Sequence, residues 1–262
     1  MMTLPADTAA NHELEKVIAQ PSRFALFFDV DGTLIELAPT PESVVVPSDL
    51  PLAIARASNR YGGAVALLSG RSIAWLDQRF EGKVGAIGGL HGLERRGRTG
   101  LIEALVPPPY LEVARLMIDE FARQDEAILV EDKGLAIAVH YRAAQDRREA
   151  IETLLADIAI QSEGALEAIG GKALVELRTA GADKGSALEA FMHESPFNGR
   201  IPVFFGDDRT DEDGFRAVRQ LGGIAVAVGR PAEEVGAMVS LSEPASVRAF
   251  LMRAAGVDEG VA

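Results

Sequence analysis

The hydrophobic and polar residues of this chain fall into blocks that predict short buried strands separated by amphipathic helices. Short, mainly apolar runs occur at residues 24–28, 64–68, 84–87, 201–205 and 224–228. Runs of this length are shorter than a typical helix and suit strands buried on both faces. Between them, apolar residues recur at helical spacing, as Ile73, Leu76 and Phe80 do. This alternation predicts an α/β fold with a doubly wound, Rossmann-like parallel sheet.

The pattern changes after three consecutive prolines, Pro107, Pro108 and Pro109, which are strong turn signals. The residues that follow predict helix, hairpin, helix and hairpin, with helices over 110–124 and 143–160 and strands over 128–131, 135–141, 167–169 and 173–178. Such an order is typical of an α+β unit with an antiparallel sheet. From Asp183 the first pattern returns. We therefore expect a core domain over 1–106 and 181–262, with an α+β cap domain inserted over 107–180.

Polar side chains capable of chemistry stand at the ends of several predicted elements. Asp29 and Asp31 follow the first strand, Ser69 follows the second, Lys184 opens the helix after the insert, and Asp207 follows the strand at 201–205. Parallel strands of an open α/β sheet bring their carboxyl ends to one edge, where ligands bind. Taken singly, the same residues have ordinary explanations, because Asp-x-Asp-Gly and Ser-Gly are typical of turns and a lysine at a helix start is usually exposed.

The acidic stretch from Asp207 to Asp213 is harder to explain without a bound cation. A helix dipole favours acids at a helix start, and Thr210 is expected to cap a helix from about Asp211 to Leu221. That accounts for Asp211 and its neighbour but not for Asp207 and Asp208 at the strand end. Closely spaced carboxylates repel one another unless a cation or solvent relieves the charge.

The stretch Asp29-Val30-Asp31-Gly32-Thr33-Leu34 after a buried strand resembles the first motif of the haloacid dehalogenase superfamily. Ser69, Lys184 and the Gly206-Asp207-Asp208 stretch occupy the places of its later motifs. The resemblance implies that Asp29 is a phosphoryl-accepting nucleophile and Asp31 a general acid and base. It further implies that Ser69 and Lys184 hold the phosphoryl group.

The same resemblance implies one Mg²⁺ ion, since a phosphate dianion repels a carboxylate nucleophile. Its protein ligands would be Asp29, the backbone carbonyl of Asp31, and Asp207, with Asp208 as a further candidate. Magnesium prefers hard oxygen ligands of this kind. An aspartyl-phosphate intermediate would divide one difficult displacement into two easier ones.

The stretches 89–94, 130–134, 139–142 and 206–212 together resemble the trehalose-6-phosphate phosphatase family, and the resemblance runs from about Phe24 to Val228. It implies Mg²⁺-dependent hydrolysis of trehalose 6-phosphate to trehalose and phosphate. Implied substrate-binding residues of the cap are Glu131, Lys133, His140, Arg142 and Glu176. Implied substrate-binding residues of the core are Gly32, Thr33, Gly70, Arg71, His91 and Gly92. The segment before Phe24 is too short for the synthase domain that some family members carry, so the chain is expected only to hydrolyse.

Other interpretations stay open at the level of the sequence. Period-two alternation places Ala138, His140 and Arg142 on one strand face, but a solvated sheet edge would show the same pattern. The substrate could instead be sucrose phosphate or mannosylglycerate phosphate. A non-catalytic sugar-phosphate sensor is a further alternative, against which Asp31 argues because a pure binder needs no general acid.

The composition of the chain excludes some classes of binding partner and indicates where in the cell the protein works. The chain has 262 residues, a formal net charge of −13 and no cysteine. The negative charge argues against nucleic acid and anionic membranes as partners, and the absence of cysteine excludes disulfides and thiolate metal sites. No apolar segment is long enough to span a bilayer, and the first twenty residues lack a signal-peptide core. We expect a soluble, cytoplasmic protein that binds a small-molecule sugar phosphate and shows no obligate protein partner.

Overall fold

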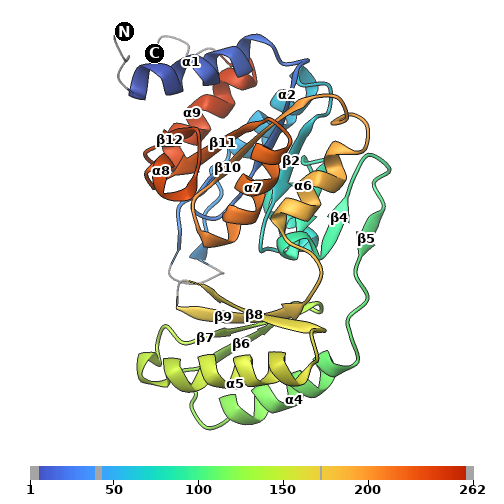
Figure 1. Ribbon diagram of the computed structural model, residues 1–262, viewed down its shortest axis with the longest axis vertical. Coiled ribbons are helices and arrows are strands. Elements are labelled where there is room, and N and C mark those ends of the chain that lie inside the picture. Colours follow the sequence, from blue (N-terminus) through green and yellow to red (C-terminus); the bar gives the residue numbers. More distant parts are fainter. Residues whose placement is uncertain (1–5, 39–42, 172, 258–262) are drawn as a thin grey trace. The chain divides into compact units, whose positions relative to one another are not determined.

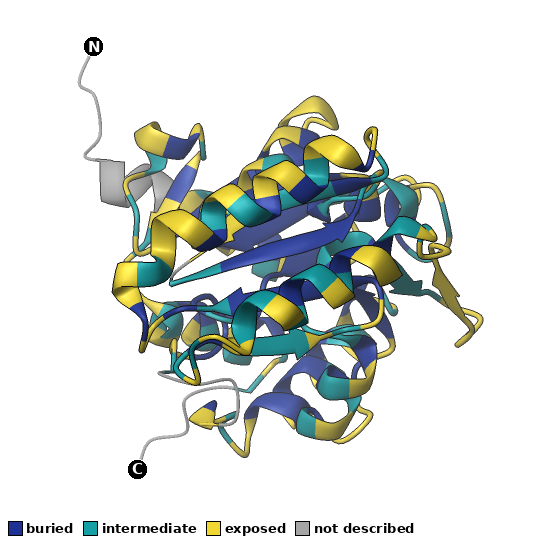
Figure 2. Ribbon diagram, turned by 90° about the horizontal axis from the view of Figure 1, so that it is seen from below, coloured by how far each residue is buried: buried dark blue, intermediate teal, exposed yellow. Residues whose placement is uncertain are grey.

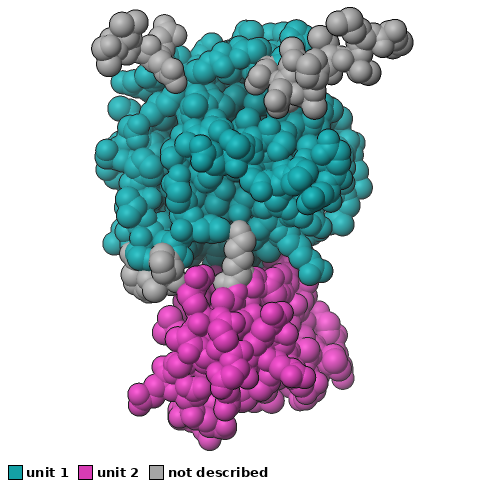
Figure 3. All heavy atoms as spheres, turned by 90° about the vertical axis from the view of Figure 1, so that its left-hand side faces the viewer, with its two compact units in different colours: residues 1–103, 183–262 teal, residues 104–182 magenta. Residues whose placement is uncertain are grey.

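The structure is a computed structural model that describes residues 6–38, 43–171 and 173–257. It divides into two compact units (Figure 3): unit 1 comprises Met1–Glu103 and Asp183–Ala262, and unit 2 comprises Ala104–Ala182. The insert expected over 107–180 lies inside unit 2. Within the described ranges, no helix combines the length and the apolar character needed to cross a membrane.

Unit 1 is built on an eight-stranded sheet with the order β12-β11-β10-β1-β2-β3-β4-β5 (Figure 1). Its parallel strands are β1 (Phe24–Phe28), β2 (Val65–Leu68), β3 (Ala86–Gly89), β10 (Ile201–Gly206), β11 (Ile224–Val228) and β12 (Val239–Leu241). At the far side β4 (Glu94–Arg96) pairs antiparallel with β3, and β5 (Ile102–Ala104) forms the sheet edge.

The chain leaves β1 toward β2 and β3 on one side and returns as β10 on the other. The strand order therefore reverses between β1 and β10, which pair in parallel with Phe28 opposite Phe205. In open α/β sheets such a switch point leaves a crevice at the carboxyl ends of the two strands. The residues that follow Phe28 and Phe205 are those that the sequence singled out for chemistry.

Helices cover both faces of this sheet. They are α1 (Ala6–Ala19), α2 (Leu50–Arg60), α3 (Ile73–Arg79), α6 (Lys184–Met192), α7 (Glu212–Gln220), α8 (Ala232–Val235) and α9 (Pro244–Ala254). Alternate residues of β1 enter two separate cores: Leu26 and Phe28 pack with α1, α2, α3 and α9, whereas Ala25 and Phe27 pack with α6, α7 and α8. The central strands are accordingly buried on both faces (Figure 2), as their continuous apolar runs predict.

Unit 2 contains a four-stranded antiparallel sheet with the order β6-β7-β9-β8. Its elements are α4 (Tyr110–Ala122), β6 (Leu129–Asp132), β7 (Ala136–His140), α5 (Arg148–Gln161), β8 (Leu166–Gly171) and β9 (Leu174–Thr179). Ile137, Val139 and Leu177 pack with apolar residues of α4 and α5 in a separate core. One sheet face is thus covered by the helices of unit 2, and polar residues gather on the other.

Three short strands were not predicted. β4 and β5 consist of half-buried or exposed residues, so they lack the apolar run by which the other strands were recognised. β12 has a single buried residue, Val239. β5 and β12 are the two edge strands of the sheet and β4 lies next to β5, so all three stand where little burial is required.

Candidate active site

The carboxyl end of β1 carries Asp29, which is buried at 4% exposure. Its backbone N–H donates to Phe205 O of β10 at 2.9 Å, so the parallel ladder fixes the position from which the side chain projects. Two residues later the chain turns back on itself, and Gly32 N–H donates to Ile35 O at 2.8 Å. The sheet therefore positions Asp29 rigidly, and a tight turn carries Asp31.

Lys184 joins Asp29 to Asp211 in a buried ion-pair group. Its Nζ donates to Asp29 Oδ1 and to Asp211 Oδ1, both at 2.6 Å. The three side chains are 3%, 5% and 0% exposed for Lys184, Asp29 and Asp211. Asp183 caps α6 through a capping box with Ser186, which places Lys184 in the first turn of that helix.

Asp211 binds the loop after β10 in addition to pairing with Lys184. Its second oxygen, Oδ2, accepts the backbone N–H groups of Asp207 and Asp208 at 2.9 and 3.0 Å. Asp208 in turn accepts from the Thr210 backbone at 2.8 Å and from its hydroxyl at 2.7 Å. Asp208 therefore caps the short helix Arg209–Asp211 that precedes α7, and the expected cap of α7 by Thr210 is wrong, because α7 begins at Glu212 without a side-chain cap. Asp211 ties the loop after β10 to the lysine of α6.

Two carboxylates contact the Lys184 ammonium group, and the pKa values of the group reflect this crowding of charges. Burial raises the pKa of Asp29 well above its usual value; Lys184 opposes this shift, and Asp211, Asp207 and Asp208 add to it. Burial alone would lower the pKa of Lys184, but Asp211 and Asp29 outweigh it, so the pKa is raised and the ammonium stays charged. Carboxylates in such excess favour a bound cation.

The donors present fit Mg²⁺. Carboxylate oxygens of Asp29, Asp207 and Asp211 lie within 4.8 Å of one another, and hard oxygens are the ligands that this ion prefers. Asp211 already uses both oxygens on Lys184 and the backbone, so Asp29 and Asp207 are the two acids of this group that would hold a cation. A side chain at Gly32 would collide with the Asp207 carboxylate, and its φ of +89° favours glycine as well. The glycine thus allows Asp207 to approach the β1 loop.

This acidic group differs from the one expected from the sequence. Arg71 holds both carboxylate oxygens of Asp31, with Nε and Nη2 each at 2.9 Å; the metal ligand expected from Asp31 is its backbone carbonyl, which this pairing does not involve. Asp208 uses Oδ1 to accept from Thr210, and its role as a metal ligand stays a prediction. Asp211, which the sequence interpretation treated as a helix-start acid, is the most buried acid of the group.

The loop after β2 holds Ser69, Gly70 and Arg71 beside Asp31. Ser69 is 1% exposed, and its hydroxyl accepts the Arg71 backbone N–H at 3.1 Å. The Arg71 guanidinium lies 4.6 Å from the ring centroid of Trp75 in α3, a cation–π contact that orients it. Thr33, also buried, has a hydroxyl without a hydrogen-bond partner among the described residues, so it can serve a ligand oxygen.

His91 and Gly92 follow β3 in the short helix η2 (Leu90–Gly92). The His91 backbone donates to Ser69 O at 2.8 Å, and a Cβ on Gly70 would stand 2.5 Å from His91 Nε2. A Cβ on Gly92 would meet Asp183 O, also at 2.5 Å. The two glycines therefore bring the loops after β2 and β3 and the start of α6 into close contact.

The remaining predicted residues lie in unit 2. Glu131 and Glu176 flank Ala138 across the sheet, on the face opposite the helix-covered core. His140 Nε2 lies 3.0 Å from Glu131 Oε2, and Lys133 Nζ donates to Glu176 Oε2 at 2.5 Å. Arg142 is exposed and comes after the end of β7. The four paired residues form two acid–base pairs on one sheet, a pattern suited to sugar hydroxyls.

Sequence reasoning missed two features that build this site. The pairing of Arg71 with Asp31 joins residues 40 positions apart, and no local pattern signals it. Glu94 accepts the Ile73 backbone N–H at 2.5 Å and so secures the start of α3. Glu94 stood within the stretch 89–94 that carried the family resemblance, but nothing in that stretch indicated this contact.

Comparison with known proteins finds similar sequences over most of the chain. A family model described as trehalose-phosphatase matches residues 27–244. A probable trehalose-phosphate phosphatase of Sinorhizobium fredii is 39% identical over 229 residues, covering 87% of this chain and 86% of the relative. A trehalose-6-phosphate phosphatase of Escherichia coli is 39% identical over 217 residues, covering 81% and 80%.

Solved structures give the same fold. The C-terminal domain of a C. albicans trehalose-6-phosphate phosphatase superposes with a TM-score of 0.81 at 20% identity, covering 97% of this chain and 98% of that one. A phosphatase of the haloalkanoate enzyme superfamily from Bacteroides thetaiotaomicron gives a TM-score of 0.58 at 17% identity, covering 90% and 96%. The predicted α/β core of the haloacid dehalogenase type is thereby confirmed.

Proposed function

The chain belongs to the trehalose-phosphatase family of phosphate monoester hydrolases, and from this membership we propose that it hydrolyses trehalose 6-phosphate to trehalose and inorganic phosphate, with Mg²⁺ as cofactor and Asp29 as nucleophile. The observation that carries the mechanism is the buried group of Asp29, Lys184 and Asp211 at the switch point. Lys184 binds Oδ1 of Asp29 and so leaves Oδ2 as the attacking atom.

In the first step Asp29 Oδ2 forms a bond to phosphorus while the bond from phosphorus to the sugar 6-oxygen breaks. Asp31, in its protonated form, gives its proton to that oxygen, and trehalose leaves as a neutral alcohol. Asp31 must first part from Arg71, which holds it at 2.9 Å through two hydrogen bonds. Arg71 is then available to the phosphate, since a guanidinium fork matches either anion.

In the second step Asp31 takes a proton from a water molecule, whose oxygen attacks phosphorus and releases Asp29 from the aspartyl-phosphate. Lys184 remains charged throughout and balances the anionic oxygens. Ser69 and Thr33 supply hydroxyl groups to the phosphoryl oxygens. Asp29, Asp207 and the Asp31 backbone carbonyl would hold Mg²⁺, which when bound offsets the repulsion between the phosphate dianion and the carboxylate.

Unit 2 supplies the preference for the sugar in this proposal. Its two pairs, Glu131 with His140 and Lys133 with Glu176, offer donors and acceptors to vicinal hydroxyls. A site that hydrogen-bonds hydroxyl groups strongly disfavours analogues lacking them, because its polar groups are then left unpaired. The names of the curated relatives favour trehalose 6-phosphate over sucrose phosphate or mannosylglycerate phosphate.

The test is release of phosphate from trehalose 6-phosphate, sucrose phosphate and mannosylglycerate phosphate, each with Mg²⁺ and with chelator. We expect turnover of trehalose 6-phosphate alone, lost on chelation. Asp29→Asn should lower the rate by at least about 10³-fold, since it removes the nucleophile. Asp49→Asn is the matched control, because Asp49 precedes α2 without a side-chain capping bond.

The results of this assay test the proposed substrate and the proposed mechanism independently. Equal turnover of another sugar phosphate would contradict the proposed substrate and keep the chemistry. Full activity in Asp29→Asn would contradict the nucleophile, and full activity in chelator would contradict the cofactor.

A further inference from the structure

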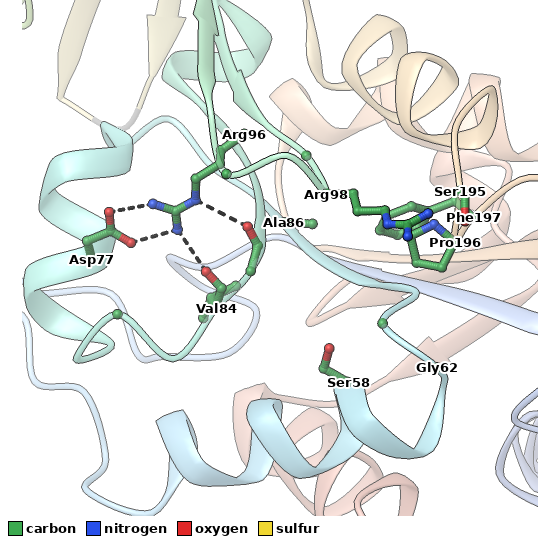
Figure 4. Close-up of a pocket in the computed structure, with 15 residues that line it drawn as sticks. Ser58, Gly62, Asp77, Val84, Ala86, Arg96, Arg98, Ser195, Pro196 and Phe197 are labelled. Carbon is green, nitrogen blue, oxygen red and sulfur yellow. Dashed lines mark hydrogen bonds and ion pairs between the residues drawn. The ribbon is translucent and has the colours of Figure 1, made fainter.

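Unit 1 contains a cavity of about 910 Å³ beside the amino ends of β2 and β3 (Figure 4). Its walls include Gly62 and Gly63, which lead into β2, and Gly82 and Gly85, which lead into β3. The catalytic residues follow the carboxyl ends of these strands, whereas this cavity lies at their amino ends. Its volume falls within the range of small-molecule sites.

Charges within the cavity walls leave a net positive character. Asp77 is neutralised by Arg96, whose Nη1 and Nη2 donate to its two oxygens at 2.6 and 2.7 Å. Arg98 also lines the cavity. It is exposed, and no hydrogen bond or ion pair is found for it within the described part of the chain. In a chain of net charge −13, an arginine without a carboxylate partner marks a place where an anion is favoured.

A further arginine stands behind the same wall. Arg200 donates only to backbone carbonyls, of Pro196 at 2.8 Å, Pro21 at 3.0 Å and Phe24 at 3.1 Å. Its Nη2 would lie 3.0 Å from a Cβ placed on Gly62, which lines the cavity. No carboxylate pairs with it among the described residues. A Cβ on Gly97, also in the lining, would collide with Glu194, whose charge Arg95 balances. The net positive charge of the lining therefore rests on Arg98.

The shape of the cavity depends on an absent side chain at Gly85. The backbone of Gly85 does not require glycine, since its φ is not in the left-handed region, and no atom lies within 4 Å of an ideal Cβ there. The glycine therefore leaves the backbone of the cavity wall open at this position, and a larger side chain there would meet open space. Ser58 adds a hydroxyl that points into the space, and Pro196 an apolar wall (Figure 4).

From these observations we propose that the cavity binds a small organic anion, of about the size of a mononucleotide, whose phosphate or carboxylate pairs with Arg98. The organic part would lie against Gly85 and Pro196, and Ser58 would hydrogen-bond to it. This site is separate from the catalytic one and does not depend on the proposed function.

Binding is tested by amide chemical-shift mapping of the ¹⁵N-labelled full chain, titrated separately with adenosine 5′-monophosphate and with citrate. The first probe carries a phosphate and a flat ring, and the second carries carboxylates only. We expect saturable shifts at residues 82–85 and 97–100 with at least one probe. Arg98→Gln should weaken this binding at least about tenfold, because a charge-assisted hydrogen bond is lost.

Gly85→Leu should abolish binding by filling the cavity while leaving the fold intact, since its Cβ meets open space. Arg56→Gln, at an exposed arginine of α2 that does not line the cavity, is the charge-matched control and should leave affinity within about twofold. Shifts confined to residues 29–33 and 69–71 would place the anion in the catalytic site and overturn the proposal. So would no shift at 10 mM of either probe, or equal affinity in Arg98→Gln and wild type.

Discussion

At the scale of the single residue, Lys184 acts in two ways. Its ammonium group balances the charge of Asp29 and Asp211, and the same two contacts hold the active site together. Its contacts at 2.6 Å to Asp29 and Asp211 are fully buried. A buried ion pair adds little net stability relative to apolar residues, but removing one partner leaves an uncompensated buried charge. The chemistry and the stability of unit 1 are therefore linked through this lysine.

Replacing Lys184 by methionine should lower the free energy of unfolding by about 3–5 kcal/mol, because two buried carboxylates lose their counter-ion. Urea denaturation without Mg²⁺ measures the loss. Lys16→Met is the control: Lys16 pairs with Glu13 on the surface, and such pairs contribute about 0–1 kcal/mol. The double variant Lys184→Met/Asp29→Asn should recover part of the loss. Equal losses for Lys184→Met and Lys16→Met would refute the argument.

Arg71 is the second residue whose contacts carry a prediction. Lysine cannot reproduce its two parallel N–H bonds to Asp31 or its stacking on Trp75. We expect Arg71→Lys to lower kcat for trehalose 6-phosphate by about ten- to a hundredfold, since lysine cannot offer the phosphate the guanidinium fork that Arg71 presents once Asp31 has parted from it. Arg79→Lys is matched, because Arg79 also stacks on Trp75, at 5.4 Å. An unchanged kcat in Arg71→Lys would show that the guanidinium of Arg71 has no part in the reaction.

At the scale of elements, the sequence predicted those strands and helices that bury enough apolar residues to leave a clear pattern. β1, β2, β10 and β11 are apolar throughout because helices cover both of their faces. β4, β5 and β12 were missed since they lie at or next to the sheet edges and bury too few residues to show such a run. The site residues on strand ends followed from the same logic. Asp211 and the Arg71–Asp31 pair did not, because they depend on which loops the fold brings together.

The contact between α1 and α2 gives a prediction about pH. Tyr61, at the end of α2, is buried and donates its hydroxyl to Val17 O at 2.9 Å. Burial raises its pKa to about 12, against a small opposing effect of Arg60. The folded state therefore keeps the phenol neutral while the unfolded chain ionises near pH 10. Stability from this group is complete below pH 10 and is lost as the pH rises toward 12.

The variant Tyr61→Phe removes the hydroxyl group and so measures its contribution to stability. At pH 7 the variant should be less stable by about 0.5–1.5 kcal/mol, the contribution of a typical hydrogen bond. Between pH 10 and 12 the wild type should lose about 1–2 kcal/mol more than the variant, since ionisation of the unfolded state is absent from the latter. Urea denaturation at both pH values measures the difference. A constant gap across this range would contradict the assignment.

At the scale of the whole molecule, the two units have separate cores: unit 2 packs Ile137, Val139 and Leu177 with its own helices. The proposed Mg²⁺ ligands all belong to unit 1, as does the single tryptophan, Trp75. A cation that binds only the folded form of one unit stabilises that unit by mass action. Metal binding should thus raise the stability of unit 1 and leave that of unit 2 unchanged.

Tryptophan fluorescence during urea denaturation reports on unit 1, and hydrogen exchange at the amides of β7 and β9 reports on unit 2. With Mg²⁺ at ten times its dissociation constant, unit 1 should gain about 1.4 kcal/mol, and exchange in β7 and β9 should stay unchanged without substrate. Asp207→Asn should remove the gain and Asp49→Asn should keep it. If protection rose equally in both units, the metal would be acting on both units or on their coupling, and the restriction of its ligands to unit 1 would be wrong.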